Sequence, residues 1–137
     1  MTGLEAQYTL EYTYRRAVGP VVGRFLTSLR EGRLEGQRTA SGEVIVPPTG
    51  YDPNTGEALT EWVPVGPGGV VTTWAFVGGE APFAWALVRL DGATTAMLHK
   101  VRVGSSSEIR TGMRVRACFS ASPVGAITDL EGFEVEP

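Results

Sequence analysis

The sequence contains a single cysteine, Cys118, and a single histidine, His99, among 137 residues. One residue of each type cannot form an intrachain disulfide, an iron–sulfur cluster or a tetrahedral zinc site built from protein ligands alone. The sequence also lacks a run of about 18 apolar residues, and its N-terminus lacks the apolar segment of a secretion signal. We therefore expect a cytoplasmic protein without a membrane span.

Lysine is nearly absent as well, because eleven of the twelve basic residues are arginine and only Lys100 is lysine. The net charge of -3 argues against a protein whose main task is to neutralise nucleic-acid phosphate. Basic residues do gather between Lys100 and Arg116. Arg114 and Arg116 in this stretch are candidate contacts for an anionic group, and a solvated strand face is the alternative interpretation.

Glycine, proline and valine are plentiful, which favours a mainly β protein with many short strands. Residues 66–137 contain five strand-like segments joined by short turns and one longer loop, the pattern of a small closed barrel such as the OB-fold. The expected strands are 70–77, 84–90, 94–101, 113–119 and 126–134. Asp91-Gly92 is typical of a tight hairpin between the second and third. We expect at least one of the pairs Trp74/Phe76 and Phe83/Trp85 to fill the barrel interior.

The first 35 residues are predicted to form an arm and an amphipathic helix. Tyr8, Leu10, Tyr12 and Tyr14 alternate, so they share one side of the chain if it is extended. A helix is expected from Pro20 to Glu31, with an apolar face that includes Val21, Phe25 and Leu29 and with Gly32 ending it. Residues 36–65 resemble a long hairpin, in which segments 43–46 and 61–65 flank the turn-rich sequence TGYDPNTGE.

The sequence contains no recognisable set of catalytic residues. No nucleophile elbow or phosphate-cradling glycine motif is present, and His99 lies among apolar and basic residues on an expected strand. Two arginines on the face of Cys118 favour a lowered thiol pKa, although an inert thiol is the commoner outcome. From the residues alone, the chain is a scaffold or a binding module.

The order of the segments is informative beyond any one motif. An aromatic arm is followed by LTSLREGRLEGQR, GEVIVPP, EWVPV, GPGGVVTTW, EAPFAWALVRLDG and the RTGMRV strand. Together they resemble the acyl-CoA-associated OB-fold proteins that carry a rubredoxin-like zinc ribbon. That family has a cysteine pair on each side of the GEVIVPP-like segment, whereas these places read RTASG and TGYDPNTGE here. The resemblance therefore implies a zinc-free, degenerate ribbon hairpin at 36–65 and no metal cofactor.

Members of this family are non-catalytic partners of thiolase-superfamily enzymes. The cysteine-free ribbon is similar to that of the subunit accompanying the steroid side-chain aldolase, a thiolase relative similar to lipid-transfer proteins. The resemblance thus implies a heteromeric lyase or thiolase complex in which the partner holds the catalytic residues and binds acyl-CoA. The residues expected at the partner interface are aromatic or proline: Tyr8, Tyr12, Tyr14, Phe25, Pro47, Pro48 and Tyr51.

A different function also fits the barrel pattern. OB-folds bind single-stranded nucleic acid by stacking bases on aromatic side chains. The aromatic residues of the expected barrel and the basic stretch from Lys100 to Arg116 could serve this purpose, although the net charge weighs against it.

Overall fold

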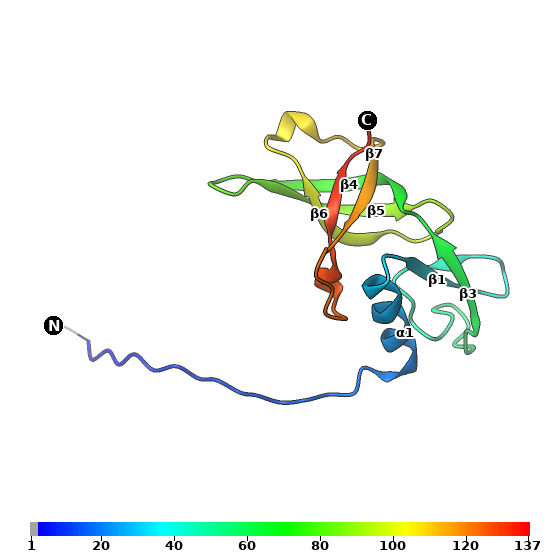
Figure 1. Ribbon diagram of the computed structural model, residues 1–137, viewed down its shortest axis with the longest axis horizontal. Helices are drawn as coiled ribbons and strands as arrows, with labels where there is room; N and C mark the ends of the chain where they lie inside the picture. Colours follow the sequence, from blue (N-terminus) through cyan, green and yellow to red (C-terminus); the bar gives the residue numbers. More distant parts are fainter. Residues whose placement is uncertain (1–2) are drawn as a thin grey trace.

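The computed structural model describes residues 3–137. It comprises an extended N-terminal arm, one α-helix, a three-stranded sheet and a five-stranded barrel (Figure 1). The arm, residues 3–18, has no regular secondary structure and runs away from the other elements. None of the helices found in residues 3–137 is long and apolar enough to cross a membrane.

Helix α1 (Gly19–Arg30) confirms the predicted helix to within one residue at each end. Pro20 lies in the first turn, where its missing N–H costs no hydrogen bond. At the other end Gly32 adopts a φ of 75°, and the Arg33 N–H donates to the Ser28 carbonyl at 2.8 Å. Such a left-handed glycine lets the chain turn back at once, so α1 leads directly into the first strand.

The second element is a small sheet of order β2-β1-β3, formed by β1 (Leu34–Arg38), β2 (Val44–Ile45) and β3 (Glu61–Val65). The predicted hairpin of 43–46 with 61–65 is therefore wrong in its pairing, because β1 lies between the two strands. Close approach explains Gly36 at the centre of β1: a Cβ there would lie 2.8 Å from the Ile45 carbonyl oxygen. This sheet with its two loops is called the ribbon below.

The remaining strands close into a barrel of order β4-β5-β6-β8-β7. They are β4 (Gly68–Val77), β5 (Phe83–Leu90), β6 (Met97–Arg102), β7 (Arg114–Phe119) and β8 (Leu130–Val135). Only β6 and β8 pair in parallel. Five strands closed in this order form an OB-fold, which confirms the predicted fold class.

Two connections differ from the predictions. The link between β5 and β6 is no tight hairpin, because Thr94 and Thr95 leave the barrel and bond to the ribbon before β6 begins at Met97. The last strand begins at Leu130 rather than 126. Residues Ile127–Asp129 form a 3-10 turn, and two short 3-10 segments, this one and Ser106–Glu108, are the remaining helical elements of residues 3–137.

The core is one continuous cluster that joins α1, the ribbon and the barrel. Inside the barrel, β5 contributes small residues, Ala84, Ala86 and Val88, each at most 1% exposed. Because alanines line this wall, Phe83 and Trp85 of the same strand face outwards. Trp74 and Phe76 pack against the core but remain half-buried. Neither aromatic pair therefore fills the interior completely.

Candidate partner-binding surface

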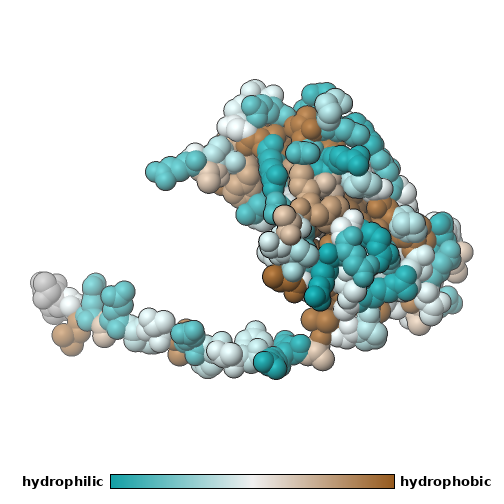
Figure 2. Space-filling view, in the orientation of Figure 1, coloured by the Kyte–Doolittle hydropathy of each residue, from teal (hydrophilic) through white to brown (hydrophobic). Residues whose placement is uncertain are grey.

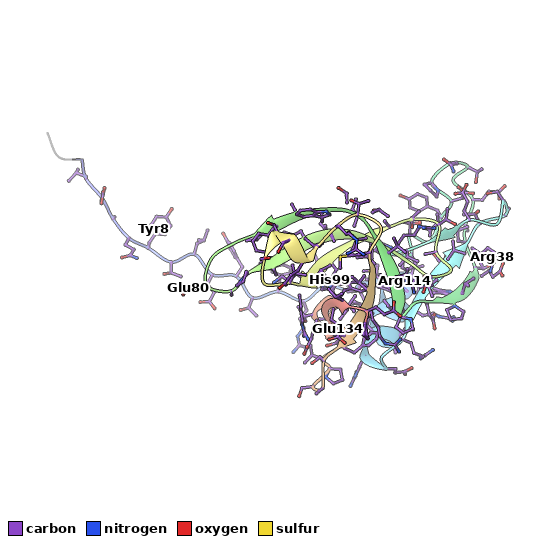
Figure 3. The ribbon with its side chains drawn as sticks, turned by 90° about the horizontal axis from the view of Figure 1, so that it is seen from above. Tyr8, Arg38, Glu80, His99, Arg114 and Glu134 are labelled. Carbon is purple, nitrogen blue, oxygen red and sulfur yellow. The ribbon has the colours of Figure 1, made fainter. Side chains whose placement is uncertain are left out.

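The arm carries the most exposed aromatic side chains of the described residues. Tyr8, Tyr12 and Tyr14 are each about three-quarters exposed or more, and no backbone hydrogen bond joins residues 8–14 to any other part of residues 3–137. Figure 3 shows Tyr8 far out on the arm, apart from His99 and Arg114 of the barrel. In Figure 2 the arm and the rest of the molecule border an open hollow. A group of solvent-exposed apolar side chains is typical of a site that binds another molecule.

The other residues predicted for the interface divide into two groups. Phe25 is 4% exposed within the core and Pro48 is also buried, so neither presents its side chain to a partner in this structure. The role of these two residues at the interface stays a prediction. Pro47 and Tyr51 are exposed on the ribbon. The exposed part of the predicted interface therefore consists of the three arm tyrosines, Pro47 and Tyr51.

Side-chain hydrogen bonds hold the ribbon loop TGYDPNTGE, residues 49–57. Gln37, 1% exposed, donates its Nε2–H to the Leu59 carbonyl at 3.2 Å and accepts from the Gly50 N–H at 2.8 Å. Asp52 accepts from the Asn54 N–H at 2.8 Å within the same loop. No group of three histidine, cysteine or acidic side chains in residues 3–137 is arranged to hold a metal ion.

The turn from Thr39 to Glu43, which lies at the sequence RTASG, is closed in the same way. Thr39 donates its N–H to the Glu43 carbonyl at 2.8 Å, and its hydroxyl accepts from the Glu43 N–H at 3.1 Å. The same hydroxyl lies 3.0 Å from the hydroxyl of Ser41. Both turns of the ribbon thus keep their shape through bonds made by their own polar side chains.

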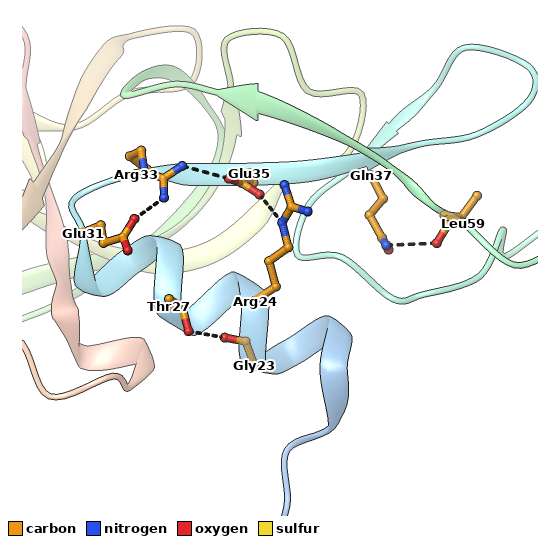
Figure 4. A network of polar contacts seen from close by, with 8 residues as sticks. All are labelled: Gly23, Arg24, Thr27, Glu31, Arg33, Glu35, Gln37 and Leu59. Atoms are coloured by element: carbon orange, nitrogen blue, oxygen red, sulfur yellow. Dashed lines mark hydrogen bonds and ion pairs between the residues drawn. The ribbon is translucent and has the colours of Figure 1, made fainter.

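A charged network joins α1 to the ribbon (Figure 4). Glu35 is buried on β1 and receives Arg24 Nε at 3.0 Å and Arg33 Nη1 at 3.1 Å. The Arg24 guanidinium also lies 4.4 Å from the centre of the Trp62 ring. A buried carboxylate needs such partners, because an unpaired one would cost several kcal/mol. These groups therefore stabilise the fold and are not free to bind a ligand.

The two candidate anion contacts on β7 have different surroundings. Arg114 makes two bonds to Asp91, at 2.7 and 2.6 Å, and a third to Glu136 at 3.1 Å. These hydrogen bonds raise the pKa of Arg114 and lower that of Asp91. Arg114 is thus already paired with two carboxylates, and its contact with an anionic ligand stays a prediction. Arg116 forms no ion pair within residues 3–137.

Arg116 lines a groove of about 390 Å³ between the ribbon and the barrel. Its apolar walls include Val65, Ala117 and Phe119, and Arg33 lies on the ribbon side. The Arg33 guanidinium is paired with Glu31 and Glu35, which leaves Arg116 as the free cation of the groove within the described chain. The groove can therefore take an apolar group next to one negative charge.

The outer face of β5 and β6 carries one of the two aromatic pairs that were candidates for the barrel interior. The rings of Phe83 and Trp85 meet edge to face at 5.3 Å, and Lys100 Nζ lies 4.7 Å from the Phe83 ring centre. Leu98, 60% exposed, is the cross-strand neighbour of Leu87 on this face. The signal that could have found this face is the alanine alternation of β5, since small residues fit the narrow interior of a barrel.

The reactive side chains are placed for structure. Burial raises the pKa of the Cys118 thiol and Glu134 raises it further, and these effects outweigh the lowering of the pKa by Arg102. Burial lowers the pKa of His99, whose ring meets Phe133 edge to face at 6.2 Å. His99 Nδ1 accepts the Lys100 N–H at 2.8 Å. The raised pKa keeps the Cys118 thiol protonated, and the His99 Nδ1 lone pair is occupied.

Comparisons with known proteins agree with this architecture. The family model described as the ChsH2 C-terminal OB-fold domain matches residues 62–120. A protein of unknown function from the DUF35 family of Sulfolobus solfataricus has a similar structure, with a TM-score of 0.67 and 14% identity over 86% of this chain and 87% of that one. A chain of the Ltp2-ChsH2(DUF35) aldolase gives a TM-score of 0.64 and 22% identity over 88% and 98%.

No protein of curated function matches the sequence. The two structural likenesses concern the fold, and the family match covers most of the ribbon's last strand and the barrel as far as Ser120. The resemblance predicted from the order of the segments is thereby confirmed.

Proposed function

We propose that this protein is a non-catalytic accessory subunit that binds and stabilises a thiolase-superfamily acyl-CoA enzyme. The enzyme proposed is a steroid side-chain-cleaving retro-aldolase in the cytoplasm, and this subunit helps to form its acyl-CoA channel. The observation that carries the proposal is the exposed aromatic arm on a fold similar to ChsH2 of the Ltp2-ChsH2 aldolase. Cys118 is a thiol with a raised pKa, and His99 is hydrogen-bonded to the backbone. Both observations support a role without catalysis.

The proposed contacts are the exposed members of the predicted interface. The tyrosines of the arm wrap the partner, while Pro47 and Tyr51 meet it from the ribbon. Aromatic anchors of this kind commonly dominate the binding energy of an interface. Arg116 is proposed to meet an anionic group of the acyl-CoA, or of the partner, at the mouth of its groove.

Co-expression with an affinity-tagged Ltp2-type aldolase subunit tests the proposal. We expect the two chains to co-purify, and we expect the triple variant Tyr8→Ala/Tyr12→Ala/Tyr14→Ala to lose at least tenfold in affinity. The variant Thr9→Ala/Thr13→Ala alters the same arm without touching an aromatic anchor and serves as the matched control. Failure of the wild-type chain to bind any thiolase-like subunit would contradict the proposal.

One observation favours a second candidate function, the binding of single-stranded nucleic acid. The exposed Trp85 and the half-buried Phe83 lie beside Lys100 on the second and third strands of the barrel, where OB-folds bind oligonucleotides. Filter binding at two salt concentrations separates the candidates. Contacts to phosphate require affinity to fall steeply with salt, and the accessory-subunit proposal expects no binding at either concentration.

A further inference from the structure

The arm has the properties of a β-strand that lacks a partner. Residues 8–14 read YTLEYTY, in which large apolar side chains alternate with threonine and glutamate. Tyrosine and threonine favour extended backbone, and an alternating pattern suits a strand with one covered face. In this structure the segment is extended, its tyrosines are exposed, and its backbone bonds to nothing else in residues 3–137.

The same chain offers an open edge that could accept a strand. β7 pairs with β4 only at residues 68–70, and two further backbone bonds connect Val71 to the loop at Gly112 and Met113. From Thr72 to Val77, β4 pairs with β5 on one side and with no segment of residues 3–137 on the other. Figure 1 shows this half of β4 projecting beyond the barrel with β5.

The two outer strands of the ribbon sheet have protected edges, whereas this segment of β4 does not. Natural proteins guard their edges with charge, with proline or by covering them. β3 carries Glu61 and Pro64. The backbone of β2 is covered by Thr94 and Thr95. The segment TTWAFV at Thr72–Val77 contains neither a charged residue nor a proline.

We propose that, in the free protein, the arm of each copy adds as a strand to Thr72–Val77 of a second copy. The two contacts are reciprocal, so the assembly closes as a symmetric dimer. In the paired arm the tyrosines lie on the side of Trp74 and Phe76, whose rings are half-buried. Pairing of aromatic side chains across neighbouring strands is favourable.

The contact area is large enough for a specific dimer. A buried tyrosine removes about 150 Å² from water, so the three tyrosines of each arm remove about 900 Å² in total before the covered edge is counted. A specific interface buries roughly 1,200 Å² or more, counting both sides. The covered surface of two β4 edges supplies the remainder.

A second copy is a better occupant than the same copy. The arm leaves α1 at the end that faces away from the barrel (Figure 1). Only Arg15–Val18 separate Tyr14 from α1, and four residues span at most about 14 Å. The same tyrosines are proposed above to contact the aldolase subunit, so binding of that partner and arm exchange compete. Arm exchange between two copies of this chain does not require the aldolase subunit, so it is tested in the absence of that subunit.

Light scattering on the purified full chain measures its mass. We expect twice the monomer mass of 14.6 kDa. The variant Thr9→Pro/Thr13→Pro keeps all four apolar side chains of the segment but removes two backbone donors from each arm. We expect it to raise the dimer dissociation constant at least about 100-fold. The control Thr9→Ala/Thr13→Ala retains the donors and should remain dimeric.

An edge variant provides the reciprocal test. Thr73→Asp/Ala75→Asp places charges on exposed positions of β4 and should also give a monomer, with an unfolding midpoint close to that of the proline variant. Mixing this variant with the proline variant restores one intact arm and one intact edge, so a heterodimer is expected. A wild-type chain that is monomeric in solution would overturn the proposal. A dimer that survives both the proline and the aspartate substitutions would overturn it as well.

Discussion

At the scale of single residues, the amide of Gln37 joins parts of the ribbon that lie far apart in the sequence. It bonds to Leu59 and Gly50 from a site that is 1% exposed. Gln37→Ala leaves a buried N–H and a buried carbonyl without partners, so we expect the free energy of unfolding to fall by about 2–4 kcal/mol. Urea denaturation followed by tryptophan fluorescence measures the loss.

Gln7 on the exposed arm is the matched control, because Gln7→Ala removes the same side chain where it has no buried partner. Its effect should stay within about 0.5 kcal/mol. Equal stability of the two variants would show that the Gln37 amide does not stabilise the ribbon.

Asp129 makes stability depend on pH. Its carboxylate accepts the backbone N–H groups of Val124, Gly125 and Ala126, and these bonds lower its pKa. A lowered folded-state pKa means that the stabilisation is complete above the unfolded value of about 3.9 and is lost as the pH falls through the folded value. The stability advantage of the wild-type chain over Asp129→Asn should therefore be constant above about pH 5 and shrink below about pH 4.

Urea denaturation of both chains across this pH range provides the comparison. Asp129→Asn does not titrate at this position, so its remaining acid sensitivity reports the other carboxylates. Parallel stability profiles for the two chains would contradict the role assigned to the Asp129 carboxylate.

At the scale of elements, the segment between β5 and β6 fastens the barrel to the ribbon. The Thr95 hydroxyl accepts the Val46 N–H at 2.8 Å and donates to the Val46 carbonyl at 2.9 Å. Thr95→Val keeps the shape of the side chain but removes both bonds. We expect a loss of about 1–3 kcal/mol in the free energy of unfolding, together with faster amide hydrogen exchange at Val46.

Thr72→Val is the control, because the Thr72 hydroxyl makes one exposed bond within the barrel, to the Leu87 carbonyl. Exchange at Val46 should be unchanged in this variant. Faster exchange across the whole barrel in Thr95→Val would indicate global destabilisation rather than release of the ribbon.

Some elements could be predicted from the sequence because one physical rule determined them. The helix follows from Pro20, the four-residue apolar repeat and Gly32, while β7 follows from strict alternation. β1 was missed because burial of Glu35 and Gln37 breaks that alternation. Their burial depends on arginines of α1 and the α1–β1 turn and on loop backbone far away in the sequence, and no local pattern reveals such partners.

The candidate partner-binding surface, like the fold, could be predicted only in part. The alternation of Tyr8, Tyr12 and Tyr14 follows from the sequence, and these side chains are exposed in the structure, while their contact with a partner stays a prediction. The burial of Phe25 and Pro48 depends on how the helix and ribbon pack, which the sequence alone does not fix. The engagement of Arg114 by Asp91 depends likewise on the register between strands 23 residues apart.

At the scale of the whole molecule, the ribbon is expected to fold without metal. In a structural zinc site the binding energy of the metal is folding energy, and a chelator unfolds the protein. Here Gln37, Thr39 and Asp52 hold the corresponding turns through hydrogen bonds. We therefore expect excess EDTA to leave the unfolding temperature unchanged, and purified protein to contain far less than one zinc per chain by elemental analysis. A stoichiometric metal content, or a lower unfolding temperature in EDTA, would show that the hydrogen bonds alone do not hold the ribbon.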